Sequence, residues 1–163
     1  MGIMSALGMM AKPIFSPVFN AITDFIRIPG GSVTAGVSMM FIVFTAAYIH
    51  KKGAGALMGL CQALVSLSTG IGAAAGLPVV FTYTLPGVAI DLVLLSPLYK
   101  KDLKLCMMTA GACGVLAGAG ATNIMFFHLN FVSFILFYFF GILSGALGGY
   151  IAWSIYKRIG EYV

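Results

Sequence analysis

The sequence has few charged residues. Asp, Glu, Lys and Arg make up only 8% of its 163 residues, and only four of these side chains are acidic, whereas soluble domains carry about 25% charged residues. Hydrophobic residues reach 61%. Because a chain of this length cannot bury so much apolar surface in a water-facing fold, we expect lipid to be its solvent.

The motifs of nucleotide binding and catalysis are also missing. The chain has no G-x-x-x-x-G-K-[ST] loop, so we do not expect it to hydrolyse ATP itself. Its three cysteines, Cys61, Cys106 and Cys113, lie in apolar runs without a C-x-x-C pair, which indicates buried free thiols. No nucleophile–base pair or metal-ligand spacing is present. We therefore predict neither an enzyme nor a resident cofactor or metal.

Six apolar runs divide the chain, and about 20 apolar residues are enough to cross the hydrocarbon core of a bilayer. We predict a single all-α transmembrane domain, built as a bundle of six helices. Lys12, Pro13 and Pro17 interrupt the first run, which predicts a short and kinked first helix. The predicted spans cover residues 2–22, 32–49, 53–72, 79–98, 105–124 and 131–156.

Basic residues follow every second run, at Lys51–Lys52, Lys100–Lys104 and Lys157–Arg158. This parity places all three clusters on one side of the membrane, and the preference of Lys and Arg for the cytoplasm makes both termini cytoplasmic. The net charge of +5 thus reflects topology and contact with membrane lipid, and it does not indicate a nucleic-acid groove.

Small residues recur at four-residue spacing on three of the runs. Such stripes allow helix backbones to approach closely inside a membrane, so they predict a tightly packed bundle. The stripes are Gly55, Gly59 and Ala63; Ala110, Gly114 and Gly118; and Gly141, Gly145 and Gly149.

Polar residues gather at the ends of the runs that lie opposite the basic clusters. Hydrogen-bonding groups mixed with aromatic rings suit a pocket for a small, water-soluble molecule. For any single residue, contact with water is a sufficient explanation, but the set as a whole favours a binding site. The candidates are Asn20, Gln62, Thr82, Tyr83, Asn123, His128 and Asn130.

Asp91 is an isolated carboxylate within the fourth run. A charged group inside a membrane helix is costly, so it indicates a functional residue by default, with Lys12 or another cation of the bundle as its partner. Two roles stay open for Asp91 at this point, contact with a ligand and structural pairing.

Several segments resemble the substrate-binding S components of energy-coupling-factor vitamin transporters. These segments are the proline-containing first helix (Pro13–Asn20), the Pro-Gly-Gly loop at Pro29–Gly31, AAYIHKKGAGAL at Ala46–Leu57, and LPGVAID at Leu85–Asp91. The resemblance is greatest to the branch for thiamine or its hydroxymethylpyrimidine precursor. It implies capture of a vitamin or precursor at the plasma membrane of a prokaryote.

The resemblance also implies partners and roles. A transmembrane coupling subunit and two ATPase subunits would drive uptake, and Asp91 would bond an aminopyrimidine by a charge-assisted hydrogen bond. Gly2 stands where cobalt and nickel members carry a histidine, which favours an organic cargo. The first loop would form a lid through Asp24, Arg27, Pro29, Gly30 and Gly31, and small residues of the first helix, Gly2, Ala6 and Gly8, would dock the coupling subunit.

Two other classes of protein are alternatives. A small stand-alone transporter or channel would use the glycine stripes to form homo-oligomers. A membrane enzyme would need Asp91, His50 and His128 to converge, but the predicted topology puts the two histidines on opposite sides of the membrane. The enzyme is therefore the weaker alternative.

Overall fold

The computed structural model describes the backbone of residues 2–23, 31–70, 76, 78–127 and 131–160. Within these ranges it describes the side chains of all residues except 12, 16, 18–23, 31–34, 126, 127, 131–133 and 160. The described part contains helices and no strand, which confirms the predicted all-α fold.

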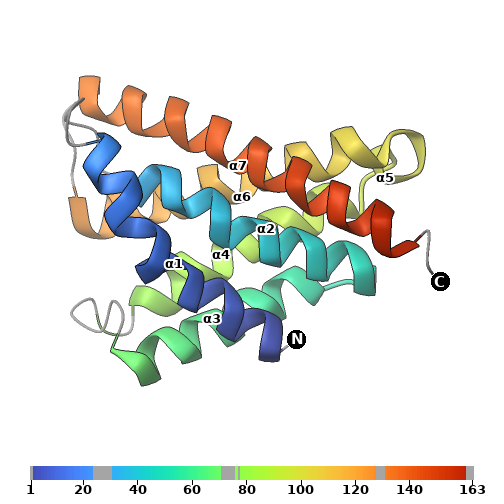
Figure 1. Cartoon of the computed structure of the whole chain (residues 1–163), viewed down its shortest axis with the longest axis horizontal. Helices are drawn as coiled ribbons and strands as arrows, with labels where there is room; N and C mark the ends of the chain where they lie inside the picture. Colours follow the sequence, from blue (N-terminus) through green and yellow to red (C-terminus); the bar gives the residue numbers. More distant parts are fainter. Residues whose placement is uncertain (1, 24–30, 71–75, 77, 128–130, 161–163) are drawn as a thin grey trace.

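Six long helices coincide with the six apolar runs (Figure 1). A four-residue helix, α5, lies between α4 and α6, and a π-helical segment, η3, extends α6. The elements are α1 (Gly2–Thr23), α2 (Gly31–Ile49), α3 (Ala54–Thr69), α4 (Pro78–Leu94), α5 (Leu98–Lys101), α6 (Leu103–Thr122), η3 (Asn123–Phe127) and α7 (Phe131–Gly160).

The predicted boundaries need three corrections. Helix α1 is not short, because it continues through Pro13 and Pro17 for 22 residues. Helix α3 ends at Thr69, where Gly70 adopts a left-handed conformation (φ +74°) that glycine tolerates at a helix C-terminus. Helix α4 ends at Leu94, and Pro97 then begins the turn into α5.

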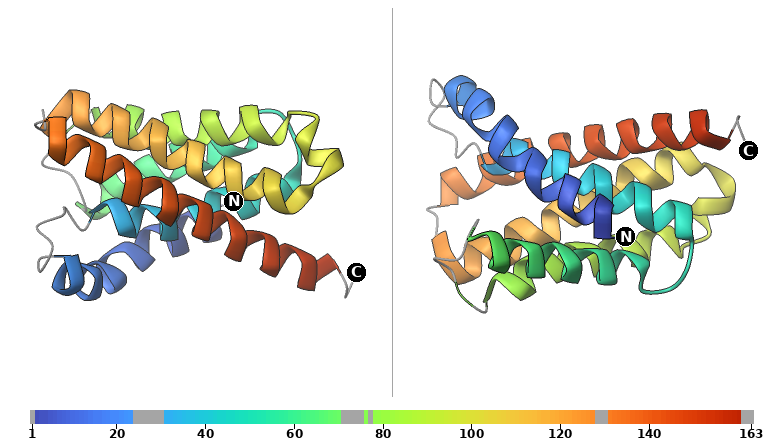
Figure 2. Two further views of the ribbon diagram at one scale, coloured as in Figure 1. Left: turned by 90° about the horizontal axis from the view of Figure 1, so that it is seen from above. Right: turned by 60° about the horizontal axis from the view of Figure 1, so that its bottom comes forward.

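The long helices form a closed ring. Neighbours pack in the order α1, α2, α7, α6, α4 and α3, and α3 returns to α1. Figure 2 shows α6 and α7 running side by side along the bundle. Helix α2 also contacts α3, α4 and α6, so its residues Ile42 and Val43 lie fully buried at the centre. In this arrangement each of the six long helices can contribute side chains to the interior of the bundle.

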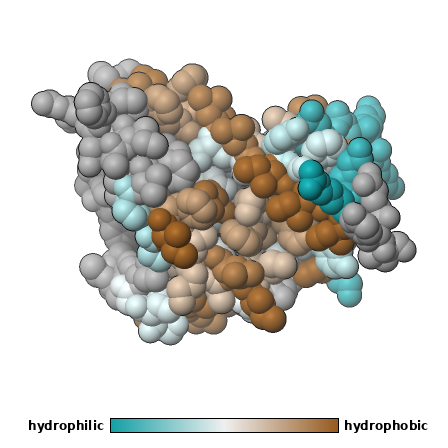
Figure 3. All heavy atoms as spheres, viewed as in Figure 1, coloured by the Kyte–Doolittle hydropathy of each residue, from teal (hydrophilic) through white to brown (hydrophobic). Residues whose placement is uncertain are grey.

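The outer surface of the bundle is apolar. Leu92, Phe81 and Leu147 are each at least 60% exposed, and Figure 3 shows apolar residues over the middle of one face. Two segments, Leu103–Met125 and Phe134–Ile159, are long and apolar enough to cross a membrane by length and composition. The other four long helices have shorter apolar stretches, so the six-span topology stays a prediction.

Helix α5, the end of α2 and the C-terminal part of α7, which carry or adjoin the basic clusters, lie at one end of the bundle (Figure 1), and Figure 3 shows hydrophilic residues at this end. The His50 ring stacks on Tyr99 of α5 with centroids 3.9 Å apart, and Tyr99 Oη donates a hydrogen bond to the Ala47 carbonyl at 3.3 Å. Burial, and then the neighbouring Tyr156 hydroxyl, raise the pKa of Tyr99 well above its usual value. Tyr99 therefore stays a neutral hydrogen-bond donor that joins α2 to α5.

The glycine stripes form the contacts between neighbouring helices, as predicted. A Cβ atom added to Gly55 would lie 2.6 Å from the Gly87 carbonyl oxygen, so α3 and α4 touch through their backbones. A Cβ atom on Gly145 would fall on the backbone of Gly111 in the same way, which joins α7 to α6. Gly118 faces Pro86 and thereby joins α6 to α4. Only glycine permits such close backbone approach.

Candidate functional site

The carboxylate of Asp91 binds the N-terminus of the neighbouring helix α3. Its Oδ1 accepts a hydrogen bond from the Gly55 N–H at 2.7 Å, and its Oδ2 accepts one from the Ala56 N–H at 2.9 Å. The first N–H groups of a helix have no partner within that helix and favour negative charge. Gly53, at the N-cap position, has no side chain to supply one. Asp91 therefore caps α3 from α4.

This contact gives the buried carboxylate a structural partner. Asp91 is only 8% exposed, and both of its oxygen atoms are engaged by α3. Its partner Gly55 lies two helical turns from Gln62, toward the Lys51–Lys52 turn. Direct contact between Asp91 and a ligand stays a prediction, whereas its helix-capping role accounts for a charge at this depth.

Gln62 is buried without a hydrogen-bond partner. Its side chain is 0% exposed, and neither Nε2 nor Oε1 has a partner among the residues that the structure describes. A Cβ atom added to Gly8 would lie 2.6 Å from Gln62 Nε2, which places the amide against α1. A buried amide left unsatisfied costs about 1–3 kcal/mol. The role of Gln62 in binding a ligand stays a prediction.

Other polar groups are buried on α1, α2 and α3. Ser5 of α1 donates a hydrogen bond from Oγ to Met58 Sδ of α3 at 3.0 Å, and Ser66 of α3 is fully buried one turn beyond Gln62. Thr45 is 5% exposed, and its hydroxyl has no partner in the described part of the chain. The prediction missed Ser5 and Thr45, although each is a polar residue within an apolar run.

The threonines of the predicted pocket are satisfied within their own helices. The Thr82 hydroxyl donates to the Val79 carbonyl at 2.9 Å, and the Thr122 hydroxyl donates to the Gly118 carbonyl. Such hydroxyls keep lone pairs that can accept a further hydrogen bond. The Gln62 amide therefore has donors and an acceptor without partners among the described residues, whereas these threonine hydroxyls already donate a hydrogen bond.

The structure brings only part of the predicted set together. The backbone of Tyr83 packs on Gly59, one turn from Gln62, whereas that of Thr82 lies near Gly118 of α6. Asn123 is half-buried in η3. His128 and Asn130 lie outside the described residues, as do Asp24, Arg27, Pro29 and Gly30 of the predicted lid; Gly31 begins α2, and the side chain of Asn20 is not described.

The predicted docking residues of α1 face different ways. Gly2 and Ala6 are exposed, and a Cβ atom on Gly2 would meet nothing within 4 Å. Gly8 is buried against Gln62 and Phe41 and faces the interior. Docking through Gly2 and Ala6 stays a prediction.

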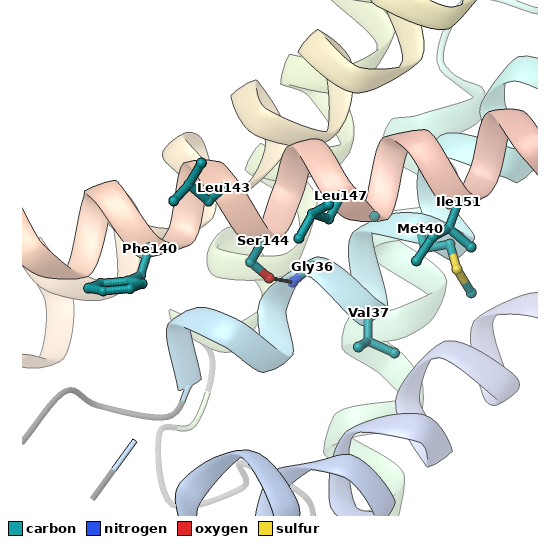
Figure 4. A pocket seen from close by; sticks show the side chains of 9 residues that line it. Gly36, Val37, Met40, Phe140, Leu143, Ser144, Leu147 and Ile151 are labelled. Carbon is teal, nitrogen blue, oxygen red and sulfur yellow. Dashed lines mark hydrogen bonds between the residues drawn. The ribbon is translucent and has the colours of Figure 1, made fainter. Parts of the chain in front are cut away.

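An apolar groove of about 390 Å³ lies between α2 and α7 (Figure 4). Its polar side chain, Ser144, accepts a hydrogen bond from the Gly36 N–H at 3.2 Å, while Phe140, Leu143 and Leu147 supply apolar walls. The groove therefore offers little to a polar cargo. No group of three or more His, Cys, Asp or Glu side chains that could hold a metal ion occurs among the described residues.

The fold is that of a helical membrane component whose apolar interior holds a few polar groups. Residues 1–117 match the family described as ABC-type cobalt transport system, permease component, and since the match covers most of the chain, the chain belongs to this family. It is thus a component of a membrane transport system. No curated protein and no solved structure matches the chain.

Proposed function

We propose that the chain is the membrane-embedded capture component of an ABC-type uptake system, and that its cargo is a small organic molecule with hydrogen-bonding groups. A vitamin or vitamin precursor of the thiamine or pyrimidine type suits this role. Family membership supports the transport role. The coupling subunit and the two ATPase subunits belong to the proposal, because the chain carries no nucleotide motif of its own.

The observation that carries the proposal of an organic cargo is the buried amide of Gln62. Its Nε2 donates two hydrogen bonds and its Oε1 accepts two, and none is made within the described residues. A pyrimidine ring presents donors and acceptors of the matching kind. Binding of such a ring would satisfy the amide, and the gain would be large because an unpaired group in a dry site is costly.

Access to Gln62 would come through α1. Helix α1 meets α3 at this level through Gly8 and the end of the flexible Gln62 side chain, and not through backbone against backbone. A small displacement of α1 would therefore open the amide without breaking a glycine contact. The first loop would then close over the cargo at the end opposite the basic clusters.

Cobalt is the second candidate cargo, since the family description names a cobalt transport system. Cobalt prefers imidazole, thiolate or carboxylate ligands. In the described part of the chain, the carboxylate of Asp91 caps α3, and Cys61, Cys106 and Cys113 form no group with histidine or acidic residues. These observations favour the organic cargo.

The glycine stripes bear on the alternative of a homo-oligomeric channel. Gly55, Gly111, Gly118 and Gly145 all contact helices of the same chain. These glycines therefore pack within one bundle. The stripes that suggested a homo-oligomer are thus not available for contacts between copies of the chain.

The experiment that tests the proposal identifies what the protein holds. The protein is purified in mild detergent and denatured, and the released small molecules are identified by mass spectrometry while a parallel aliquot is assayed for cobalt. We expect a stoichiometric organic heterocycle and no cobalt. Stoichiometric cobalt without an organic molecule would overturn the organic cargo and leave the transport role in place.

A thermal-shift panel of vitamins and Co²⁺ covers the case of an empty preparation. A ligand stabilises the folded state by RT ln(1 + [L]/Kd), so a nanomolar binder at micromolar concentration adds about 4 kcal/mol. A shift with one heterocycle supports the proposal. No shift with any compound, together with oligomers on a native gel, would favour the stand-alone channel.

A further inference from the structure

Two lysines from different helices converge on the one tryptophan of the chain. Lys104 Nζ of α6 lies 5.4 Å from the centroid of the Trp153 ring and 5.2 Å from that of Tyr150. Lys157 Nζ of α7 lies 6.0 Å from the Trp153 centroid. The Tyr150 and Trp153 rings are themselves 5.7 Å apart. The four side chains form one cluster across α6 and α7, which we call the Trp153 cluster.

Neither of the described carboxylates forms an ion pair with the lysines of this cluster. Asp102, the acidic residue nearest to Lys104 in the sequence, accepts a hydrogen bond from the Leu105 N–H at 3.1 Å and thereby caps α6. The other described acidic side chain, Asp91, caps α3. Two ammonium groups thus face the surface at the boundary between the basic end and the apolar middle of the bundle.

An apolar strip continues from the cluster toward the middle of α7. Leu143, Ile142 and Phe139 lie on the same helical face as Tyr150 and Trp153, by their spacing of three, four and seven residues. Leu143 is 48% exposed and Phe139 is 57% exposed. Positive charge, an aromatic belt and an apolar strip therefore follow one another along the surface of one helix.

We propose that the Trp153 cluster is a binding site for an anionic phospholipid. The two ammonium groups bind the headgroup phosphate, the rings of Trp153 and Tyr150 lie at the level of the glycerol backbone, and the acyl chains follow the strip of α7. Basic pockets between membrane helices recognise anionic headgroups in this way, and Trp and Tyr favour the membrane interface.

The apolar strip is what favours a lipid over an acidic protein surface. An acidic partner outside the membrane would be attracted to the lysines but would gain nothing from Leu143 and Phe139 within the hydrocarbon layer. A phospholipid matches both parts, because its charged headgroup would lie at the Trp153 cluster while its acyl chains lie along the adjoining apolar strip.

Trp153 itself reports on the site, since it is the only tryptophan. The full-length protein is reconstituted into phosphatidylcholine vesicles that contain a minor fraction of brominated phosphatidylglycerol or, in parallel, of brominated phosphatidylcholine. Bromine quenches tryptophan fluorescence on contact. We expect stronger quenching by the anionic lipid at equal fraction, with each lysine contributing a preference of up to about fivefold.

Matched variants separate a site from general surface charge. Lys104→Gln with Lys157→Gln should abolish the preference, and Lys104→Arg with Lys157→Arg should retain it. Lys51→Gln with Lys52→Gln removes the same charge from the same end and should leave the preference unchanged. Equal loss in both Gln pairs would reduce the effect to surface charge and overturn the site.

Two further outcomes contradict the proposal. Equal quenching of the wild-type protein by the two brominated lipids would show that no anionic lipid is selected. If Lys104→Gln with Lys157→Gln instead reduced recovery of ATPase subunits from the native complex while lipid quenching stayed equal, the cluster would be a protein-docking surface. Neither readout depends on the identity of the cargo, so the lipid site can fail while the proposed function stands.

Discussion

Two helix contacts in this bundle are built on different principles. Helices α6 and α7 meet through Gly111, Gly145 and Gly149, where the two backbones are in direct contact and no flexible side chain lies between them. Helices α1 and α3 meet at Gly8 and Gln62, where a backbone touches the end of a flexible amide. The first contact fixes two helices, whereas the second leaves α1 free to part from α3 at small cost. The proposed function places the cargo at the second contact.

The α3–α4 contact belongs with the fixed kind. Gly55 and Gly87 lie backbone to backbone, and Asp91 adds two hydrogen bonds at the same level. A helix pair that is locked by close packing and by a carboxylate cap makes a rigid wall. A rigid wall on one side and a movable helix on the other is the arrangement that a capture site needs.

Replacing Gly111 by alanine should have the largest effect. The new Cβ atom would fall on the Gly145 carbonyl oxygen, and backbone cannot move aside as a side chain can. We expect a loss of about 3 kcal/mol or more, at the upper end of overpacking effects. Thermal unfolding in detergent measures the loss. Gly2→Ala, where the Cβ atom meets nothing within 4 Å, is the matched control and should cost nothing.

Removing the Asp91 cap should have the next largest effect. Asp91→Ala leaves two N–H groups of a buried helix end unpaired, which costs about 2–3 kcal/mol. Asp102→Ala removes an exposed cap with one hydrogen bond, at 3.1 Å to Leu105, and should cost about 1 kcal/mol. Chemical or thermal unfolding compares the two variants. Equal losses would show that burial of the Asp91 cap contributes nothing.

Alanine at Gly8 should have the smallest effect. Its Cβ atom would come too close only to the Nε2 end of the flexible Gln62 side chain, while Phe41 lies at an ordinary contact distance of 3.4 Å. Alanine also gains up to about 1 kcal/mol of helix propensity over glycine. We expect a net change below about 1 kcal/mol in the same unfolding assay. A loss as large as that of Gly111→Ala would erase the distinction between the two kinds of contact.

Much of the fold follows from the sequence. Apolar runs predicted the six long helices, and glycine spacing predicted one side of several contacts, such as Gly55 and Gly145, because hydropathy and residue size act locally. Their partners Gly87 and Gly111 were not predicted. The predicted first span, 2–22, is close to the observed α1 (Gly2–Thr23), but the expectation of a short helix was wrong. Prolines predict a break in water more reliably than in a bundle that satisfies the freed carbonyl groups. The end of α4 before Pro97 was also missed, because the apolar run continues to Leu98.

The site was less predictable. Gln62 was among many polar candidates, and nothing in the sequence separates its unsatisfied amide from Thr82, whose hydroxyl bonds its own helix. The role of Asp91 depends on which helix end lies beside it, which is a matter of tertiary packing. One local signal did exist: Lys51, Lys52 and Gly53 before α3 include no capping side chain, so a cap from elsewhere was needed.

The most direct test of the account is the affinity of the released cargo for the Gln62→Leu variant. Leucine fills nearly the same space without polar atoms, so the ligand-free protein should keep its stability or gain up to about 2 kcal/mol. Cargo affinity, measured by calorimetry, should fall at least about tenfold, as expected when a bound ligand loses a buried hydrogen-bond partner.

Thr84→Val is the control, because the Thr84 hydroxyl already donates to the Val80 carbonyl at 2.6 Å and the proposed cargo contact does not include it. The account predicts weak binding by Gln62→Leu and full binding by Thr84→Val, with both proteins folded. Full affinity in Gln62→Leu would contradict it, as would a destabilised Gln62→Leu protein, since that would make the amide a structural group and not the cargo contact.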